Sequence, residues 1–212
     1  MLAFIAFDLD GTLIDSKRDI VDSVNAALAS EGLPILPPGE IEDLVGRGAR
    51  NLIQRAIGDP SDEILNRVFV KFWNEYLQHC LDHTALYPGV AEFLEAAAHL
   101  PMAVVTNKPE MFTRKILKGL GLESRFRWVI GGDTLPLQKP DPRIFDPIVD
   151  SLPPPVRGLM VGDSAIDIEC GKAAGLWTCG VCGGFRPREE LAAAGPDFLI
   201  GDFSGLKGLP LL

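Results

Sequence analysis

Four apolar segments, each ending in polar residues, constrain the fold of this chain more than any other feature. The first runs from Phe4 to Phe7 and is followed by Asp8-Leu-Asp10-Gly-Thr. A buried parallel strand is a short continuous apolar run, and open α/β sheets bind ligands beyond the carboxyl ends of such strands. Two carboxylates there suit a hard cation and nucleophilic or acid–base chemistry. Alone, the pattern also fits a strand that ends in an acidic turn.

Three later segments repeat this design. The apolar runs are residues 102–105, 128–132 and 158–162. The polar residues that follow them include Thr106, Asn107 and Lys108, then Lys139, and finally Asp163 and Asp167. Each run precedes a helix-like stretch, so the strands are expected to be parallel with right-handed crossovers. Their polar ends then meet at one edge of the sheet, which predicts a single cleft with four carboxylates.

This ordered set resembles the four motifs of haloacid-dehalogenase-superfamily phosphatases. The matching residues are Asp8-x-Asp10-Gly-Thr, Thr106-Asn-Lys, Lys139 and Gly162-Asp163-x-x-x-Asp167. The resemblance covers essentially the whole chain. It implies an α/β fold, with a doubly wound, Rossmann-like parallel sheet as the core. In this superfamily, an Asp two residues after the nucleophile implies a phosphatase or phosphomutase rather than a dehalogenase.

The resemblance also implies a role for each motif residue. Asp8 is expected to be the nucleophile that forms an aspartyl-phosphate, and Asp10 the general acid and base. Thr106 and Lys139 complete the catalytic set, while Asn107 and Lys108 are expected to bind substrate. The expected cofactor is Mg²⁺, held by Asp8, the main-chain carbonyl of Asp10, and Asp163, with Asp167 in an outer position. Four ionised aspartates need such a counter-charge, because like charges in one cleft disfavour ionisation.

Three stretches resemble phosphoglycolate phosphatases most: Thr106-Asn-Lys-Pro109, Gly131-Gly-Asp-Thr-Leu-Pro136 and Lys139-Pro-Asp-Pro142. We therefore expect a small phosphorylated substrate, with 2-phosphoglycolate as the leading candidate. One alternative is a sugar phosphatase or phosphomutase of the same superfamily. Another is a non-catalytic phospho-ligand sensor, which would be expected to have lost Asp8 or Asp10; both are present.

Between the first and second motifs the pattern becomes helical. Ser16-x-x-Asp19 resembles a capping box, and four successive helices without a strand are expected before Asp82. Such an insert suggests a separate lid domain, and the resemblance implies a helical cap. The expected division is a core of residues 1–14 and 82–212, with a cap of residues 15–81 and hinges near Asp15 and Asp82.

Two basic residues have open roles. Arg47 lies in Val45-Gly46-Arg47-Gly48, a break between two expected helices. It could bind a substrate carboxylate bidentately, or it could be an exposed residue in a helix-ending turn. Lys108 could point into the cleft, or it could be a solvated lysine at a helix start.

The charge and hydropathy of the sequence limit the kinds of partner that the protein can bind. The chain has 20 basic and 29 acidic residues, for a formal charge of −9, which argues against nucleic acid because phosphate-backbone binding needs clustered Lys and Arg. The apolar start meets Asp8 too soon for a signal peptide, and no run approaches the length of a membrane span. We expect a cytoplasmic protein without a membrane partner; the oligomeric state stays open.

Overall fold

A six-stranded sheet forms the centre of the protein, in a computed structural model that describes residues 2–58 and 60–211. Each strand is a short apolar run, as expected for a sheet buried on both faces. The strands of this sheet are β1 (Phe4–Phe7), β4 (Met102–Val105), β5 (Trp128–Ile130), β6 (Gly158–Gly162), β7 (Trp177–Val181) and β8 (Phe198–Ile200). All neighbouring pairs are parallel.

The strand order is β5-β4-β1-β6-β7-β8. The chain therefore builds outward from β1 on one side and then returns to build outward on the other. Ligands in open α/β sheets bind at this kind of reversal, beyond the carboxyl ends of the strands. The polar residues that follow β1, β4 and β6 are thereby placed side by side.

Helices cover both faces of the sheet. Phe7 of β1 packs in a cluster with residues of α5, α6 and the final 3₁₀ helix, whereas Phe4 packs in a second cluster with residues near α7 and α8. These covering elements are α5 (Val90–Ala96), α6 (Glu110–Gly119), η1 (Glu123–Arg125), η2 (Pro142–Phe145), α7 (Asp146–Val149), α8 (Ala165–Ala173), α9 (Arg188–Ala194) and η3 (Phe203–Gly208).

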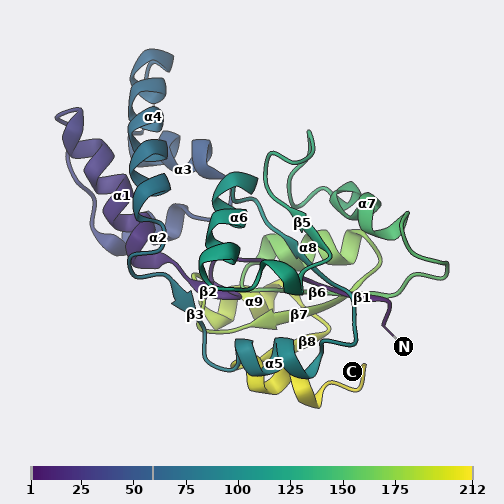
Figure 1. Cartoon of the computed structure of the whole chain (residues 1–212). Helices are drawn as coiled ribbons and strands as arrows, with labels where there is room; N and C mark the ends of the chain where they lie inside the picture. Colours follow the sequence, from purple (N-terminus) through teal and green to yellow (C-terminus); the bar gives the residue numbers. More distant parts are fainter. Residues whose placement is uncertain (1, 59, 212) are drawn as a thin grey trace.

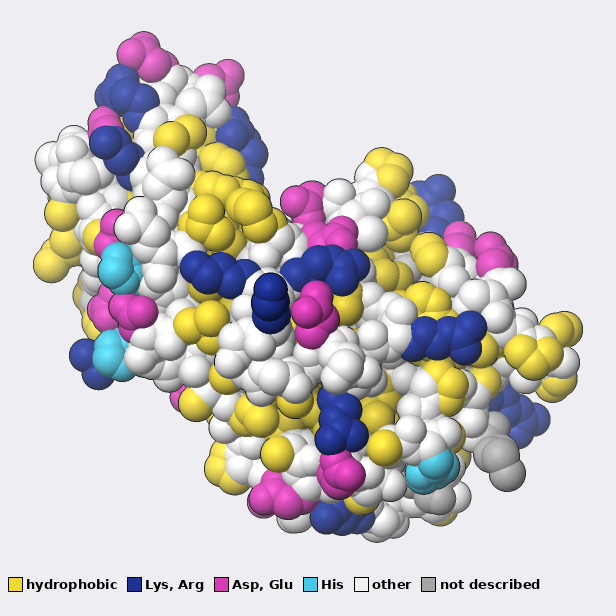
Figure 2. Space-filling model, in the orientation of Figure 1, with side chains coloured by type: hydrophobic (Ala, Val, Ile, Leu, Met, Phe, Trp, Pro, Cys, Tyr) yellow, Lys and Arg dark blue, Asp and Glu magenta, His cyan; other side chains and the backbone are white. Residues whose placement is uncertain are grey.

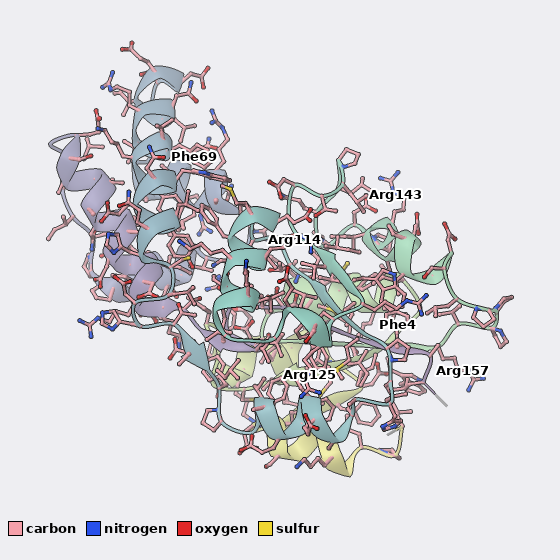
Figure 3. All side chains as sticks on the ribbon, viewed as in Figure 1. Phe4, Phe69, Arg114, Arg125, Arg143 and Arg157 are labelled. Atoms are coloured by element: carbon pink, nitrogen blue, oxygen red, sulfur yellow. The ribbon has the colours of Figure 1, made fainter. Side chains whose placement is uncertain are left out.

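A helical insertion stands beyond the carboxyl edge of the sheet (Figure 1). It consists of α1 (Lys17–Ser30), α2 (Pro38–Leu44), α3 (Ala49–Ala56) and α4 (Asp62–His79). Its apolar stripes face inward, with Val24 of α1 and Phe72 of α4 among the buried residues. Phe4, at the start of β1, lies far from Phe69 on α4 (Figure 3). The far end of β1, which leads to Asp8, is the end that faces the insertion.

A two-stranded antiparallel ribbon joins the insertion to the sheet. Its strands are β2 (Ile14–Asp15) and β3 (Ala85–Leu86), so both joints lie near the expected hinges. The Asp19 carboxylate accepts hydrogen bonds from the backbone N–H groups of His83 and Thr84 and from the Thr84 hydroxyl. Asp19 thus ties the first helix of the insertion to the returning chain.

The predicted α/β fold with a parallel sheet is confirmed, and the four helices expected between residues 15 and 81 are present. The predicted capping box at Ser16 is wrong, because Ser16 makes no side-chain cap bond. The Ser16 hydroxyl donates to Asp10 instead, and the Asp19 carboxylate binds the chain that returns from the insertion at Thr84. Among residues 2–58 and 60–211, no helix has both the length and the hydropathy needed to span a membrane.

Candidate active site

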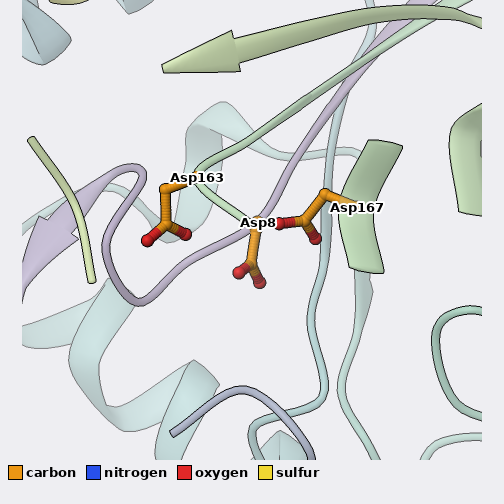
Figure 4. A group of neighbouring side chains, drawn as sticks. All are labelled: Asp8, Asp163 and Asp167. Atoms are coloured by element: carbon orange, nitrogen blue, oxygen red, sulfur yellow. The ribbon is translucent and has the colours of Figure 1, made fainter. Parts of the chain in front are cut away.

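Three carboxyl groups converge where the strands of the reversal end. Asp8 follows β1, Asp163 follows β6, and Asp167 lies in the first turn of α8. One carboxylate oxygen from each lies within 4.8 Å of the others. Figure 4 shows Asp8 between the other two. We call Asp8, Asp163 and Asp167 the aspartate cluster.

Backbone packing fixes the carboxylate of Asp163. It accepts hydrogen bonds from the Phe185 N–H at 2.7 Å and from the Thr12 hydroxyl at 3.3 Å. A Cβ atom on Gly11 would lie 2.2 Å from Asp163 Oδ2, and one on Gly184 would lie 2.3 Å from it. Glycine is therefore required at both positions for the carboxylate to fit between the two loops.

A true capping box holds Asp167. Its Oδ2 accepts from the backbone N–H of Ser164 at 3.1 Å and from the Ser164 hydroxyl at 2.7 Å. Its Oδ1 accepts from Lys139 Nζ at 2.6 Å. Lys139 Nζ also lies 2.9 Å from Asp8 Oδ1 as an ion-pair partner. The buried lysine therefore links two members of the aspartate cluster.

Burial and like charge shape the ionisation of this group. Burial, followed by the charges of Asp167 and Asp8, raises the pKa of Asp163 to about 8. Burial also raises the pKa of Asp167, while Lys139 opposes that rise. Burial alone would lower the pKa of Lys139, but the charges of Asp167 and Asp8 outweigh it and the pKa is raised. One lysine is thus too little positive charge for three carboxylates, of which Asp163 and Asp167 are buried.

The cluster fits a hard divalent cation. Lys139 Nζ lies 2.9 Å from the buried Asp8 Oδ1 and donates to Asp167 Oδ1 at 2.6 Å, so one ammonium group is shared by two carboxylates. One ammonium group shared in this way cannot neutralise the carboxylates of Asp8, Asp163 and Asp167 together. Mg²⁺ takes oxygen ligands and uses one or two carboxylates in such sites. Asp8 and Asp163 provide that donor set, with Asp167 beside them.

Asp10 belongs to a separate network. Lys108 Nζ donates to both of its carboxylate oxygens at 2.9 Å and to the Tyr76 hydroxyl at 2.6 Å. The Ser16 hydroxyl donates to Asp10 Oδ1 at 2.5 Å. The Lys108 side chain is 5% exposed, so it points inward, and the alternative of a solvated helix-start lysine is excluded. Neither Ser16 nor Tyr76 was expected in the site from the sequence.

Thr106 and Asn107 follow β4 at the same edge. Thr106 is buried and lines the cleft. The Asn107 side-chain amide donates to the carbonyls of Gly46 and Lys139, both at 3.0 Å, and accepts from the Lys139 N–H. Both N–H donors of this amide are therefore engaged by protein atoms. Substrate binding by Asn107 stays a prediction, and here the residue holds the Lys139 loop to the insertion.

A cleft opens between the aspartates and the insertion. Figure 2 shows hydrophobic side chains gathered where α4 faces α6. Between these helices Trp73 and Tyr76 pack on Phe112, with ring centroids 4.4 and 5.0 Å apart. Lining residues from the core include Asp8, Asp10, Thr106, Asn107, Lys108, Asp163, Phe185 and Arg186. The cleft therefore has a charged floor on the core side.

Arg186 is a residue that sequence reasoning missed. It follows β7 in Gly-Gly-Phe185-Arg186, and its guanidinium donates to the backbone carbonyls of Asp43 and Val45 at the end of α2. The signal for it was weak, because Cys182, two glycines and Phe185 separate Arg186 from the end of β7. Arg47 is exposed and does not line the cleft, although Gly46 and Gly48 beside it do. Its predicted role in substrate binding stays a prediction.

Comparison with known proteins identifies the family. A sequence model of the haloacid dehalogenase-like hydrolase family matches residues 5–181, a span that includes every member of the aspartate cluster, Asp10 and Lys139. The chain belongs to this family. The resemblance predicted from the four motifs is therefore confirmed.

Relatives within the haloacid dehalogenase-like hydrolases carry a more specific name. A phosphoglycolate phosphatase of Pseudomonas savastanoi pv. phaseolicola is 36% identical over 211 residues, covering 95% of this chain and 77% of the relative. One of Chromobacterium violaceum is 38% identical, covering 89% of each chain. A crystal structure described as a predicted phosphoglycolate phosphatase of Haemophilus somnus superposes with a TM-score of 0.92 at 32% identity, covering 98% and 97% of the two chains.

Proposed function

We propose that this chain is a Mg²⁺-dependent phosphomonoester hydrolase that acts through an aspartyl-phosphate on Asp8, with 2-phosphoglycolate as its substrate. The supporting observation is the Asp8 carboxylate, which lies at the reversal of the sheet with Lys139 Nζ 2.9 Å from its Oδ1 and with Asp163 and Asp167 beside it. We further propose that the insertion is the cap domain of residues 15–81, which closes over the substrate. The names of the relatives support the substrate.

In the first step an oxygen of Asp8 attacks phosphorus, and the bond from phosphorus to the leaving oxygen breaks. Asp8, Asp163 and the main-chain carbonyl of Asp10 would hold Mg²⁺, which would supply positive charge beside the nucleophile. Asp10 gives its proton to the leaving alkoxide. Lys139 offsets negative charge on the transferring group, and Thr106 donates a hydrogen bond to it.

In the second step water attacks the phosphorus of the aspartyl-phosphate. Asp10, now ionised, takes the proton from that water, and the bond from phosphorus to Asp8 breaks. This releases inorganic phosphate and returns both aspartates to their starting states. Lys108 and Ser16 hold the Asp10 carboxylate in place through their hydrogen bonds, so the same group is positioned for both proton transfers.

The phosphomutase alternative has less support. It needs an ionisable group on the insertion to exchange protons with a sugar hydroxyl. Among the described residues that line the cleft, the only ionisable side chain from the insertion is Tyr76, and burial raises its pKa well above the usual value, so it stays protonated and cannot accept a proton. The sensor alternative has no support from the aspartates, since Asp8 and Asp10 are both present and both line the cleft.

A substrate panel tests the proposal. The purified protein with Mg²⁺ is given 2-phosphoglycolate, several sugar phosphates and phenyl phosphate, and released phosphate is measured. We expect the highest kcat/KM for 2-phosphoglycolate. A preference for a sugar phosphate would contradict the proposed substrate but support the proposed reaction. If no ester released phosphate, the proposed phosphatase activity would be rejected.

A further inference from the structure

The wall that the insertion presents to the cleft is almost entirely apolar. The insertion residues that line the cleft are Ile20, Val45, Gly46, Gly48, Ala49, Leu52, Phe72 and Tyr76. In this set the Tyr76 hydroxyl is the single polar side-chain group. Tyr76 is therefore the only side chain of this wall that can donate a hydrogen bond to a leaving group.

Packing holds the Tyr76 ring in a fixed position. The ring stacks on Phe72, with centroids 5.5 Å apart and planes 11° apart, and meets Phe112 of α6 edge-on at 5.0 Å. The residue is only 1% exposed. Because its neighbours come from both the insertion and the core, the hydroxyl stays at the junction of the apolar wall and the charged floor.

The hydroxyl has a hydrogen to donate. It accepts a hydrogen bond from Lys108 Nζ at 2.6 Å, which occupies one lone pair and leaves its own O–H free. No hydrogen bond runs from this O–H to any described residue. Burial, and then the charge of Asp10, raises the pKa of Tyr76 well above its usual value, so the group remains protonated. A bond accepted from an ammonium polarises the O–H and strengthens it as a donor.

We propose that Tyr76 is a substrate-binding residue whose hydroxyl donates a hydrogen bond to an acceptor oxygen of the leaving group. This inference rests on the proposed phosphatase function. It restricts the preferred esters to those with an acceptor oxygen close to the phosphate, such as the carboxylate of 2-phosphoglycolate. The remaining apolar wall excludes water around that single polar contact.

The variant Tyr76→Phe tests this directly, because it keeps the ring and its packing and removes only the hydroxyl. The matched control is Tyr87→Phe, since Tyr87 is the only other tyrosine of the chain. Its hydroxyl is buried, lacks a partner among the described residues, and lies outside the cleft lining. Kinetics are measured with 2-phosphoglycolate and with phenyl phosphate, whose leaving group carries no additional acceptor oxygen.

We expect Tyr76→Phe to raise KM for 2-phosphoglycolate roughly ten- to a hundredfold, the range for one hydrogen bond to a charged group, with kcat changed far less. KM for phenyl phosphate should change by less than about twofold, and Tyr87→Phe should change neither.

Three results would overturn the inference. No change with either substrate would mean that Tyr76 does not contact the leaving group. Equal losses on both would mean that it acts only by holding Lys108. A wild-type protein that hydrolyses neither ester would remove the proposed function itself, and with it this role; an active wild type with an unaffected Tyr76→Phe would remove the role alone.

Discussion

The two sides of the cleft differ in the chemistry of their side chains and in how the sequence encodes them. The core side carries Asp8, Asp10, Lys108 and Asp163, all from loops that directly follow strands. The insertion side is apolar except for Tyr76. This contrast suggests a division of labour: the core performs phosphoryl transfer, and the insertion selects the leaving group and excludes water. The predictions below test that division.

The largest effect is expected on the core side. Asp8→Asn keeps the shape of the side chain and removes the attacking charge, so kcat should fall by ~10³-fold or more. Stability should hold or rise, because one of the crowded carboxylates is gone. Turnover and thermal unfolding are measured on the same preparation, with deamidation excluded by mass spectrometry. Substantial activity in this variant would break the assignment of the chemistry to the core.

Metal removal is expected to act on the same side and to depend on pH. The pKa of Asp163 is raised from its ordinary value of 3.8 to about 8, so metal-free folded protein binds a proton there that the unfolded chain has lost. That contribution to stability is full below about pH 4 and declines as pH rises toward 8. Mg²⁺ needs the ionised carboxylate, so its binding should strengthen over the same range.

Thermal unfolding with EDTA and with excess Mg²⁺ measures this effect. At pH 8, a Mg²⁺ concentration one hundred times its dissociation constant should raise Tm by about 5–10 °C. The same Mg²⁺ concentration should raise Tm by less at pH 5, because the metal then binds more weakly. EDTA should also abolish phosphatase activity, with recovery on adding Mg²⁺. Asp163→Asn should lose the stabilisation by Mg²⁺. Full activity after exhaustive EDTA treatment would contradict the site.

A smaller effect is expected where the two sides are joined. The Arg186 side chain is 15% exposed and donates to the Asp43 and Val45 carbonyls, next to the exposed Gly46-Arg47-Gly48 segment. In Arg186→Ala this segment should open more often, and trypsin should cleave after Arg47 roughly fivefold faster, as for a loss of about 1 kcal/mol. Peptide mapping over time measures the rate.

Arg188→Ala is the matched control, because Arg188 begins α9 two positions after Arg186 and its guanidinium donates to Cys182 Sγ rather than to the insertion. Its cleavage rate after Arg47 should equal that of the wild type. Equal acceleration in both variants would show a general charge effect and would remove Arg186 as the link between core and insertion.

The sequence predicted the core side well because that side is encoded locally. An apolar run that stops at Asp8 or Asp163 predicts both the strand and the functional residue that follows it, and parallel topology brings the ends of these strands together. The insertion side depends on docking. Tyr76 fits an apolar helix stripe, and only the packing of α4 on α6 brings its hydroxyl to Lys108.

Competition between partners accounts for the other differences. Ser16 precedes a helix and could cap it, but its hydroxyl bonds to Asp10 instead. Ser164 and Asp167 form the reciprocal cap that was expected at Ser16. Both serines are followed three residues later by an aspartate, and they differ because the Ser16 hydroxyl has a second carboxylate, that of Asp10, within hydrogen-bond reach.

Trapping of the phosphorylated enzyme tests the central claim most directly. In Asp10→Asn, p-nitrophenyl phosphate needs little acid assistance to leave, so the first step should proceed while hydrolysis of the intermediate stalls. We predict a burst of about one p-nitrophenol per enzyme, followed by slow turnover, and one phosphoryl group on the peptide that contains Asp8. Steady release without a burst, or a phosphoryl group on any other residue, would contradict the account.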